Sequence, residues 1–351
     1  MKTVTRHRKK RPSGGVQIRD VARLAGVSAI TVSRHLNEPE KVAEKTRAKV
    51  AAAINEIGYI PNMAARTLSS NKASVVGVIV PTITNSIFAD FIAGLSDVLE
   101  EQGYKLLISC SGYSLEREAA LIETLIAQRP AGIIVTGQAH SERGRGLLQR
   151  VRIPVVEAWE IGSAPIDIGV GFSNFNACYE MTRGLLASGY RNIAFASAPI
   201  AANDRAMGRR QGYLAAMREA GLSPELSWIR EAEFSFGRGA EVMGELVDSH
   251  PNLEAVFYAN DILAIGALIE CQRRGIRIPD DIGICGFDDV ELAAITIPSL
   301  TTVRIPRYEI GRRAAEMVMS AGTTNGPDGN VIDLGFEIIS RASTVPIFSG
   351  P

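Results

Sequence analysis

The sequence predicts an α/β fold, with a small all-α headpiece at the N-terminus and a larger two-lobed body built on parallel sheets. Three observations lead to this prediction. Residues 18–57 carry apolar side chains at helical spacing. From residue 75 onward, apolar runs of strand length alternate with amphipathic helices. With 351 residues, the chain is also too long for one core, so two or three domains are expected.

Residues 18–37, IRDVARLAGVSAITVSRHLN, have the pattern of a helix-turn-helix. Gly26 can adopt the positive φ that the turn needs, and Ser28 can cap the second helix. The inner positions are expected to be Ile18, Val21, Ala22 and Leu24 in the first helix and Ile30 or Thr31, Val32 and Leu36 in the second. The outer face of the second helix carries mainly short polar groups and one arginine, namely Ser28, Ala29, Thr31, Ser33, Arg34 and Asn37. Such a face suits the major groove of DNA, whereas the alternative is a buried helical hairpin in an ordinary domain.

A third helix is expected over residues 43–57, where it closes a three-helix core and ends at Gly58. The next stretch suits a short helix that begins at Pro61 and has a narrow apolar edge formed by Ala64, Ala65 and Leu68. Because such a helix is too short to be stable alone, it needs a partner copy and DNA to hold it. The predicted divisions are a disordered basic arm (1–16), a helix-turn-helix headpiece (17–60), a hinge helix with its linker (61–72) and a two-lobed effector-binding and dimerisation domain (73–351).

Charge is distributed unevenly although the formal net charge is zero. Residues 1–72 contain 15 Lys/Arg and 5 Asp/Glu, and the rest of the chain contains 23 and 33. A basic module on an acidic body favours a polyanionic partner at one end of the molecule only. The four cysteines, Cys110, Cys178, Cys271 and Cys285, lack metal-ligand or redox spacing, so we expect reduced core thiols, no metal and no cofactor. Neither a signal peptide nor a membrane-spanning run is predicted, and a cytoplasmic location is expected.

The body is expected to contain strands at residues 75–80, 105–110, 132–136, 155–158, 166–170, 192–196, 255–258 and 282–286. Helices are expected at residues 87–102, 115–128, 174–188, 205–220, 237–249 and 262–274. Continuous apolar strands joined by helical crossovers indicate parallel sheets that are covered on both faces. About 270 residues exceed what one such sheet needs, so the body is expected to form two lobes.

Ligands of open parallel sheets bind at the carboxyl ends of the strands. The loops expected at these ends are polar, and they comprise residues 81–86, 136–138, 199–205, 260–261 and 287–289 together with Trp159. Two lobes that face each other across these loops form a cleft lined by hydroxyls, amides, carboxylates, arginines and aromatic rings. Such a cleft fits a small polyhydroxylated or acidic metabolite.

Taken together, these features resemble the lactose-repressor (LacI/GalR) family of bacterial transcription regulators. The resemblance covers residues 17 to about 345 and rests on DVARLAGVSAITVSRHLN followed by VAEKTRAKVAAAINEIGYIPN, on Asn260-Asp261, and on Gly286-Phe287-Asp288 followed by PSLTT at 298–302. It implies a periplasmic-binding-protein-like body and a transcriptional repressor whose operator affinity is controlled by a small effector.

Within this family the chain is most similar to the gluconate-operon repressor branch. The supporting stretches are VPTITN at 80–85 with Phe88-Ala89, IPVVE at 153–157, DIGVGFSNF at 167–175 and ECQR at 270–273. The resemblance to this branch implies gluconate or a related sugar acid as the effector.

The resemblance also implies which residues contact DNA. Ala29, Ile30 and Arg34 take base-reading positions, and Ser28, Thr31, Ser33 and Asn37 take positions on phosphates. The guanidinium fork of Arg34 can bridge guanine O6 and N7, whereas Ile30 either contacts a thymine methyl or belongs to the headpiece core. Tyr59 adjoins the hinge residues Asn62, Ala65 and Leu68, which enter the minor groove as two copies, with the leucine pair wedging a base step.

For the effector, the resemblance implies Phe88, Gln138, Trp159, Arg205, Arg209, Phe234, Asn260 and Asp288. Arg205 and Arg209 lie one turn apart at a helix N-terminus, which favours a carboxylate, although a solvated helix face is the alternative. Asn260 and Asp288 suit sugar hydroxyls, and the rings of Trp159 and Phe234 suit C–H faces, with plain core as the alternative for Phe234. Asp289 and Arg307 are second-rank candidates.

Other functions remain open on the sequence alone. An enzyme on a similar scaffold is disfavoured because the chain has no GxSxG, phosphate-loop or GxGxxG motif, and its histidines do not cluster with cysteines. A sugar-binding transport protein is disfavoured by the headpiece. A regulator of the same family that senses a neutral sugar or nucleoside, or one that needs a corepressor, stays a close alternative. The tail RASTVPIFSGP lacks a leucine heptad, so a homodimer on double-stranded operator DNA is expected rather than a tetramer.

Overall fold

The computed structural model describes residues 16–60, 75–162, 164–320 and 330–347. The chain divides into two compact units, residues 1–73 and 74–351. The predictions for the basic arm and for the hinge helix, with Asn62, Ala65 and Leu68, lie outside the described residues. No helix in the described part of the chain is long and apolar enough to cross a membrane.

The first unit is a three-helix headpiece with α1 (Ile18–Ala25), α2 (Ala29–Asn37), the short 3-10 helix η1 (Pro39–Lys41) and α3 (Glu44–Ile57). Gly26 ends α1 with a φ of 65°, and the Ser28 hydroxyl caps α2 by accepting from the backbone N–H of Thr31. The fully buried core residues are contributed by all three helices and include Val21, Val32 and Val50. The helix-turn-helix predicted from the sequence is therefore present.

Leu24 was predicted for the inner face of this headpiece, as was Ile30 in alternative to Thr31, but both Leu24 and Ile30 lie on its surface. Ile30 is 72% exposed and Leu24 is 45% exposed. Successive α-helical residues are about 100° apart, so Ile30 points away from the buried side chain of Val32, two positions later. In α1, the neighbouring Ala25 takes the inward position that was predicted for Leu24. The core interpretation of Ile30 is thus wrong.

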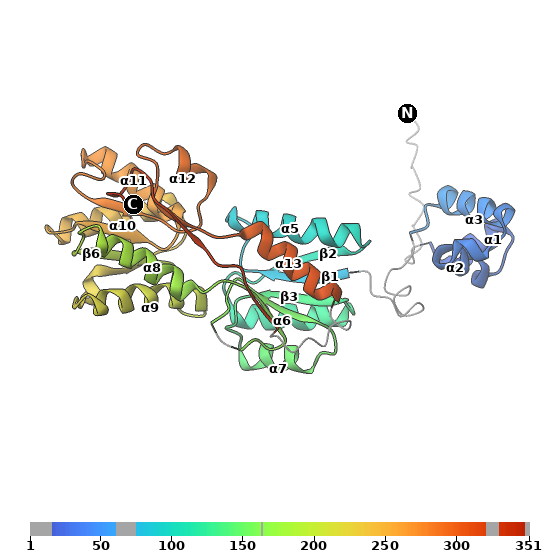
Figure 1. The fold of residues 1–351 in the computed structure, drawn as a ribbon. Helices are drawn as coiled ribbons and strands as arrows, with labels where there is room; N and C mark the ends of the chain where they lie inside the picture. The colour runs from blue at the N-terminus through green and yellow to red at the C-terminus, as the bar shows by residue number, and fades with distance from the viewer. Residues whose placement is uncertain (1–15, 61–74, 163, 321–329, 348–351) are drawn as a thin grey trace, which may run out of the picture. The chain divides into compact units, whose positions relative to one another are not determined.

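The second unit begins with lobe 1, whose six-stranded sheet has the order β11-β5-β4-β3-β1-β2 with parallel pairs. Its strands are β1 (Val75–Val80), β2 (Lys105–Cys110), β3 (Gly132–Thr136), β4 (Val155–Ala158), β5 (Ile168–Gly171) and β11 (Val331–Asp333). Helices α5 (Ile87–Glu101) and α13 (Arg307–Ser320) lie side by side on one face, and α6 (Leu115–Ala127) and α7 (Glu142–Arg150) lie on the other (Figure 1). On β1, Val76 and Val78 accordingly pack toward α5, and Ile79 packs toward α6.

Lobe 2 has a four-stranded parallel sheet in the order β7-β6-β8-β9. Its strands are β6 (Ile193–Ser197), β7 (Ile229–Glu231), β8 (Ala255–Tyr258) and β9 (Gly283–Cys285). The pair α8 (Asn174–Ala187) and α9 (Asp204–Glu219) covers one face, and the pair α10 (Phe236–Ser249) and α11 (Asp261–Arg274) covers the other. Shorter elements are η2 (Leu226–Trp228), α12 (Glu291–Ile295) and the antiparallel ribbon of β10 (Thr302–Arg304) with β12 (Glu337–Ile339).

The fold class is confirmed, and each strand and helix predicted for the body is present with ends that differ by a residue or two. The sequence prediction missed α7, α12, α13 and the strands β7, β10, β11 and β12. Each missed strand has three residues, which is too short for an alternating pattern to be recognised. One expectation for the cysteines is wrong: Cys110 is exposed, because it ends the edge strand β2, whereas Cys178, Cys271 and Cys285 are buried thiols.

A buried ionic cluster lies in lobe 1, between the end of β3 and α6. His140 Nδ1 is 2.9 Å from Glu118 Oε1, and its Nε2 is 3.1 Å from Glu157 Oε1. Burial lowers the pKa of His140, but the hydrogen bonds to the two carboxylates outweigh burial and raise it to about 9. Because both ring nitrogens face carboxylates, the imidazolium is the form that this arrangement stabilises.

The stability that His140 contributes is expected to fall as the pH rises. Its folded-state pKa of about 9 exceeds the ordinary value of 6.5, so the contribution is complete below pH 6.5 and is lost through pH 9. We expect the unfolding free energy of the wild type, relative to His140→Gln, to fall by about 3 kcal/mol between about pH 6 and pH 9.5 in urea titrations. The same comparison with His250→Gln is the control, because His250 contacts Trp228 and Ser249 instead of carboxylates. If the difference in unfolding free energy between the wild type and His140→Gln grows with pH, the prediction is contradicted.

Candidate functional site

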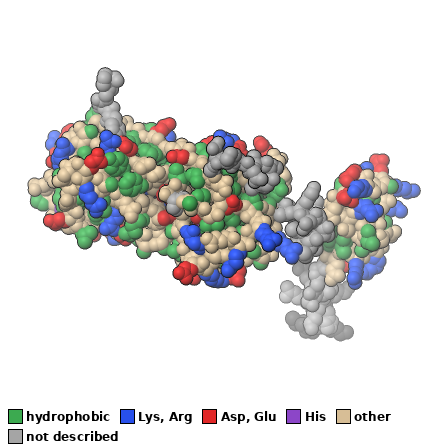
Figure 2. Space-filling view, turned by 60° about the horizontal axis from the view of Figure 1, so that its bottom comes forward, with side chains coloured by type: hydrophobic (Ala, Val, Ile, Leu, Met, Phe, Trp, Pro, Cys, Tyr) green, Lys and Arg blue, Asp and Glu red, His purple; other side chains and the backbone are tan. Residues whose placement is uncertain are grey.

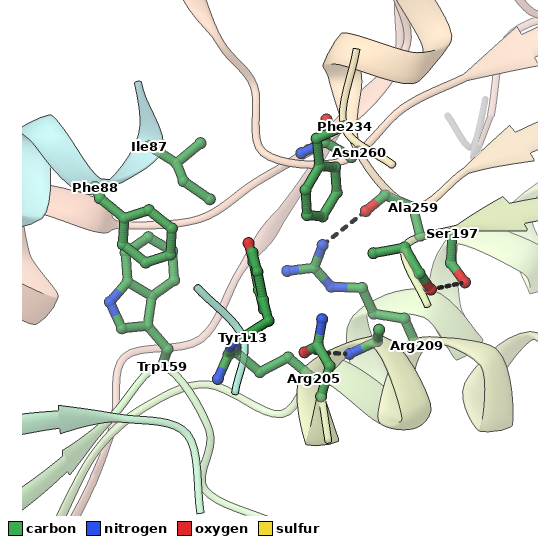
Figure 3. Close-up of a pocket in the computed structure, with 13 residues that line it drawn as sticks. Ile87, Phe88, Tyr113, Trp159, Ser197, Arg205, Arg209, Phe234, Ala259 and Asn260 are labelled. Atoms are coloured by element: carbon green, nitrogen blue, oxygen red, sulfur yellow. Dashed lines mark hydrogen bonds between the residues drawn. The ribbon is translucent and has the colours of Figure 1, made fainter. Parts of the chain in front are cut away.

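A small cavity lies in the cleft of the body, where loops from the carboxyl ends of strands in both lobes meet. Figure 3 shows the cavity, whose lining residues are Ile87, Phe88, Tyr113, Trp159, Ser197, Ala198, Asn203, Arg205, Ala206, Arg209, Phe234, Ala259 and Asn260.

Six of the eight residues predicted for the effector line this cavity, namely Phe88, Trp159, Arg205, Arg209, Phe234 and Asn260. The other two, Gln138 and Asp288, are buried beside it without lining it. The structure therefore brings six of the predicted residues together around one cavity. Asp288 lies behind the residues that line it, and Gln138 lies where the two lobes meet.

Aromatic rings from lobe 1 form one side of the cavity. The Phe88 ring centroid lies 5.1 Å from that of Trp159, and Phe91 packs on the same indole at 5.6 Å. Trp159 has a φ of 78°, in the left-handed region that non-glycine residues seldom adopt. Such strained backbone is common at binding sites, where the surrounding structure holds it in place.

Arg209 lies on the opposite side of the cavity and is held on three sides (Figure 3). Its Nε donates to Asn174 Oδ1 at 2.8 Å, and one terminal nitrogen donates to the carbonyl of Ala259 at 2.7 Å. The guanidinium also stacks 3.7 Å from the Phe287 ring centroid. Among the residues that the structure describes, the other terminal nitrogen has only a long contact, 3.9 Å from Asp288 Oδ1. That nitrogen therefore retains capacity for a ligand.

Arg205 and Asp204 connect the two lobes at the first turn of α9. Arg205 donates to the backbone carbonyl of Thr136 at 3.0 Å, across the cleft in lobe 1. The Asp204 carboxylate accepts from the backbone N–H groups of Gln138 and Ala139, the latter at 3.1 Å. These bonds close the cleft on the side of β3. The loop of Gln138 thus takes part in lobe closure through its backbone.

Asp288 is fully buried behind Asn260, which donates its amide to Asp288 Oδ2 at 2.5 Å. Burial raises the pKa of Asp288 to about 6, although Arg209 and Arg307 oppose this shift. The other carboxylate oxygen, Oδ1, has no hydrogen-bond partner among the described residues. Asp288 therefore acts on the cavity through Asn260 and Arg209 rather than by lining it.

The two second-rank candidates are engaged elsewhere. Asp289 accepts from Arg304 and Arg341, each at 2.7 Å. Arg307 pairs with Asp90 on α5 at 2.8 Å and donates to the backbone carbonyl of Asp288. Neither side chain lines the cavity.

The sequence analysis missed Tyr113, which stands near the centre of the cavity in Figure 3. Tyr113 follows the carboxyl end of β2, so the rule that selected the other loops also applies to this one. The prediction did not include the loop of residues 111–114, SGYS, although it is as polar as the loop of residues 136–138, TGQ, which was included. Burial raises the pKa of the Tyr113 hydroxyl, which therefore stays protonated as a donor.

In the headpiece, the second helix presents the predicted outer face. Ser28, Ile30 and Arg34 are exposed, and Ala29, Thr31, Ser33, Asn37 and Tyr59 are half-buried. Lys and Arg side chains occur at several places on the side of this unit seen in Figure 2. A helix with an exposed arginine and small polar groups is the usual reader of the major groove.

No group of three or more His, Cys, Asp or Glu side chains within the described ranges has a geometry suited to a metal ion. The helix-turn-helix headpiece and the two-lobed body with its cleft cavity together define a DNA-binding transcription regulator with a small-molecule site. Comparison with known proteins makes this more specific.

Two family models match the chain. The model of bacterial regulatory proteins of the lacI family matches residues 17–62, and that of the periplasmic binding protein-like domain matches residues 182–344. The HTH-type transcriptional regulator GntR of Escherichia coli (strain K12) is 37% identical over 331 residues, covering 94% of this chain and 98% of that protein. The chain belongs to the LacI family of DNA-binding transcriptional regulators. Its relatives are regulators by name, not enzymes.

Solved structures agree with this assignment. A LacI-family transcriptional regulator from Silicibacter pomeroyi has a TM-score of 0.86 and 33% identity, covering 93% of this chain and 99% of that one. The lac repressor dimer bound to operator and the anti-inducer ONPF has a TM-score of 0.79 and 25% identity, covering 94% and 99%.

Proposed function

We propose that this regulator is a repressor that leaves its operator when a sugar acid, with gluconate as the leading candidate, binds in the cleft cavity. The observation that carries the proposal is the pair Arg205 and Arg209, which lie one turn apart at the N-terminus of α9 and both line the cavity. The similarity to GntR and to the gluconate-operon repressor branch agrees with this choice.

A carboxylate suits this end of the cavity for two reasons. The first turn of α9 presents the positive end of the helix dipole, and two guanidinium groups add full charges. Within the described part of the chain, one terminal nitrogen of Arg209 has no partner closer than 3.9 Å, and its N–H groups can donate to an anion. A bound carboxylate therefore gains charge-assisted bonds without displacing the bonds that hold the arginine in place.

The rest of the cavity suits a polyhydroxylated carbon chain. The Asn260 amide and the Tyr113 hydroxyl offer polar contacts, and the rings of Phe88, Trp159 and Phe234 offer faces for C–H groups. Gln138 and Asp288 are proposed to act indirectly, through lobe closure and through Asn260.

A neutral sugar or nucleoside is the second candidate effector. It is favoured by Asp204 and Asp288, whose carboxylates lie beside the two arginines and offset part of their charge. The sugar-acid proposal is preferred because the Asp204 carboxylate already accepts from backbone groups of lobe 1.

On the DNA side, the proposed contacts are those of the second helix: Ala29, Ile30 and Arg34 on bases and Ser28, Thr31, Ser33 and Asn37 on phosphates. Tyr59 is proposed to lie beside the backbone. The proposed units are the headpiece (17–60), a hinge (61–72) whose Asn62, Ala65 and Leu68 enter the minor groove, and the body (73–351). In the minor groove, the apolar side chain of Leu68 can unstack a base step and kink the duplex.

The exposure of Ile30 yields a specific prediction. Because its side chain is 72% exposed, Ile30→Ser is expected to leave the unfolding free energy within about 0.5 kcal/mol of the wild type. Loss of its apolar contact with a thymine methyl is expected to weaken operator binding by about fivefold. Fluorescence anisotropy with an operator selected by the wild-type chain from random duplexes measures this. Leu24→Ser, on α1, is the control, and equal losses in both variants contradict the assigned contact.

A homodimer is the proposed assembly, as in the lac repressor dimer of similar fold. Strand β2 is at the edge of its sheet and exposes Leu107 and Ile108, and the loop that follows β1 exposes Ile83. In lobe 2, Ile295 and Ile297 are 69% and 95% exposed. An apolar edge strand is a liability unless another chain covers it, so these surfaces are proposed to face a second copy.

Titration calorimetry of the full-length chain tests the effector. The ligands are gluconate, 6-phosphogluconate, galactose, ribose and a purine. Saturable binding of gluconate with no response to galactose or ribose supports the proposal. A flat gluconate titration together with clear binding of a neutral ligand overturns the sugar-acid effector and favours the second candidate.

A further inference from the structure

Two outer cavities adjoin the inner cavity of the cleft. One lies toward the loop that follows β1, and the other lies toward the loops of lobe 2. Tyr113 and Phe234 are the two residues that line the inner cavity and both outer ones. They therefore stand at the boundary between an inner and an outer part of the cleft.

The two rings approach each other from opposite lobes. Tyr113 is in the loop between β2 and α6, and Phe234 is in the loop between β7 and α10. Their centroids are 6.0 Å apart with the rings tilted, which is a normal distance for an aromatic pair. In Figure 3 the Tyr113 ring stands between the Phe88 and Trp159 rings and Arg209, and Phe234 points down into the same space.

The loop that carries Tyr113 is held in place by its backbone. Ser111 and Gly112 donate their N–H groups to the carbonyls of Val80 and Pro81 at 3.0 and 2.8 Å. Tyr113 has a φ of 59°, which is costly for a residue with a bulky side chain. A fixed loop that keeps a tyrosine in a strained conformation points to a role for the ring itself.

The outer part of the cleft offers its own polar groups. The side chains of Thr82, Thr84 and Asn85 line the larger outer cavity. Asn85 is only 3% exposed, and its amide nitrogen has no hydrogen-bond partner among the described residues. An unsatisfied buried donor of this kind suits the hydroxyl of a ligand that extends beyond the inner cavity.

We propose that Tyr113 and Phe234 form an aromatic wall that limits the effector to one small unit, and that the outer cavity takes a second sugar unit when the wall is opened. This inference rests on the proposed function, because it concerns the ligand of the same cleft. Tyr113 is the specificity-determining residue, since its removal joins the inner cavity to the outer ones.

Lactobionate, which is gluconate carrying a galactosyl group, is the probe for the wall. Wild-type full-length chain is expected to bind gluconate and to reject lactobionate. Tyr113→Ala is expected to raise the affinity for lactobionate relative to gluconate at least about tenfold in titration calorimetry. Phe234→Ala opens the wall from the other lobe and is expected to act in the same direction. Tyr113→Phe retains the ring and is expected to keep the wild-type ratio.

Phe236→Ala is the matched control, because this exposed ring lies two residues from Phe234 and does not line the cleft cavities. An unchanged ratio in Tyr113→Ala, or a wild type that binds both acids equally, overturns the proposal. If the wild type binds neither gluconate nor lactobionate, the proposal of a sugar-acid effector is wrong. The comparison of wild type with Tyr113→Ala is then made with galactose and lactose as the small and the large ligand.

Fluorescence quenching tests the wall without any effector. Trp159 lines the inner cavity, and the second tryptophan is removed by Trp228→Phe. In that background, Tyr113→Ala is expected to at least double the acrylamide quenching constant of Trp159, whereas Phe236→Ala is expected to leave it unchanged. Equal quenching with and without the Tyr113 ring overturns the wall, whatever the effector proves to be.

Discussion

Replacing Arg209 with alanine is expected to weaken gluconate binding about a hundredfold, which corresponds to about 3 kcal/mol. The variant loses the guanidinium that is proposed to hold the carboxylate, and a charge-assisted bond to a buried group is worth about 1.5–3 kcal/mol. It also loses the two bonds to Asn174 and Ala259 that fix the wall of the cavity. Titration calorimetry on the full-length chain measures the effect.

Two further variants separate charge from geometry. Arg209→Lys keeps a cation but not the planar fork, so it is expected to recover only a small part of the affinity. Arg210→Ala is the matched control, because the neighbouring Arg210 points to Glu231 at 3.4 Å and does not line the cavity. If Arg209→Ala and Arg210→Ala lose gluconate affinity to a similar extent, or if Arg209→Ala keeps the wild-type affinity, then Arg209 does not hold the carboxylate.

Replacing Arg34 with alanine is expected to weaken operator binding by about ten- to a hundredfold. A bidentate contact with guanine contributes about 1–3 kcal/mol of discrimination between bases. The variant is therefore expected to lose most of its preference for the selected operator over a duplex in which that guanine is changed. Binding isotherms by anisotropy on both duplexes, at one fixed salt concentration, measure this preference.

The control for Arg34 is Arg23→Ala. Arg23 is also an exposed arginine of the headpiece, but it lies on α1 and pairs with Asp20 at 2.6 Å. Its loss is expected to leave sequence preference unchanged. If Arg34→Ala weakens binding to both duplexes by the same factor, then Arg34 contacts the phosphate backbone and the base contact is wrong.

The sequence predicts the parts of this molecule in which a repeated pattern reports a buried face. The three headpiece helices, the cap at Ser28 and the apolar strands of the body are of this kind. Six effector candidates meet around one cavity because the carboxyl ends of parallel strands lie together.

Other features depend on contacts that no local pattern encodes. Ile30 is a different case, because its hydrophobicity suits the core while the helical spacing from the buried Val32 directs it to the surface. Gln138 interacts through its backbone, so its side-chain chemistry gave no indication of the bond to Asp204. The position of Tyr113 between the lobes depends on how the loops of β2 and β7 approach each other across the cleft.

Occupancy of the cleft is expected to control operator binding by the headpiece. The direct measurement is the affinity of the full-length chain for its selected operator, by fluorescence anisotropy, with and without saturating gluconate. We expect gluconate to lower this affinity at least about tenfold, with the half-effect near the dissociation constant found by calorimetry. An operator affinity that is the same in saturating gluconate as in its absence, while calorimetry shows the acid bound, contradicts the claim.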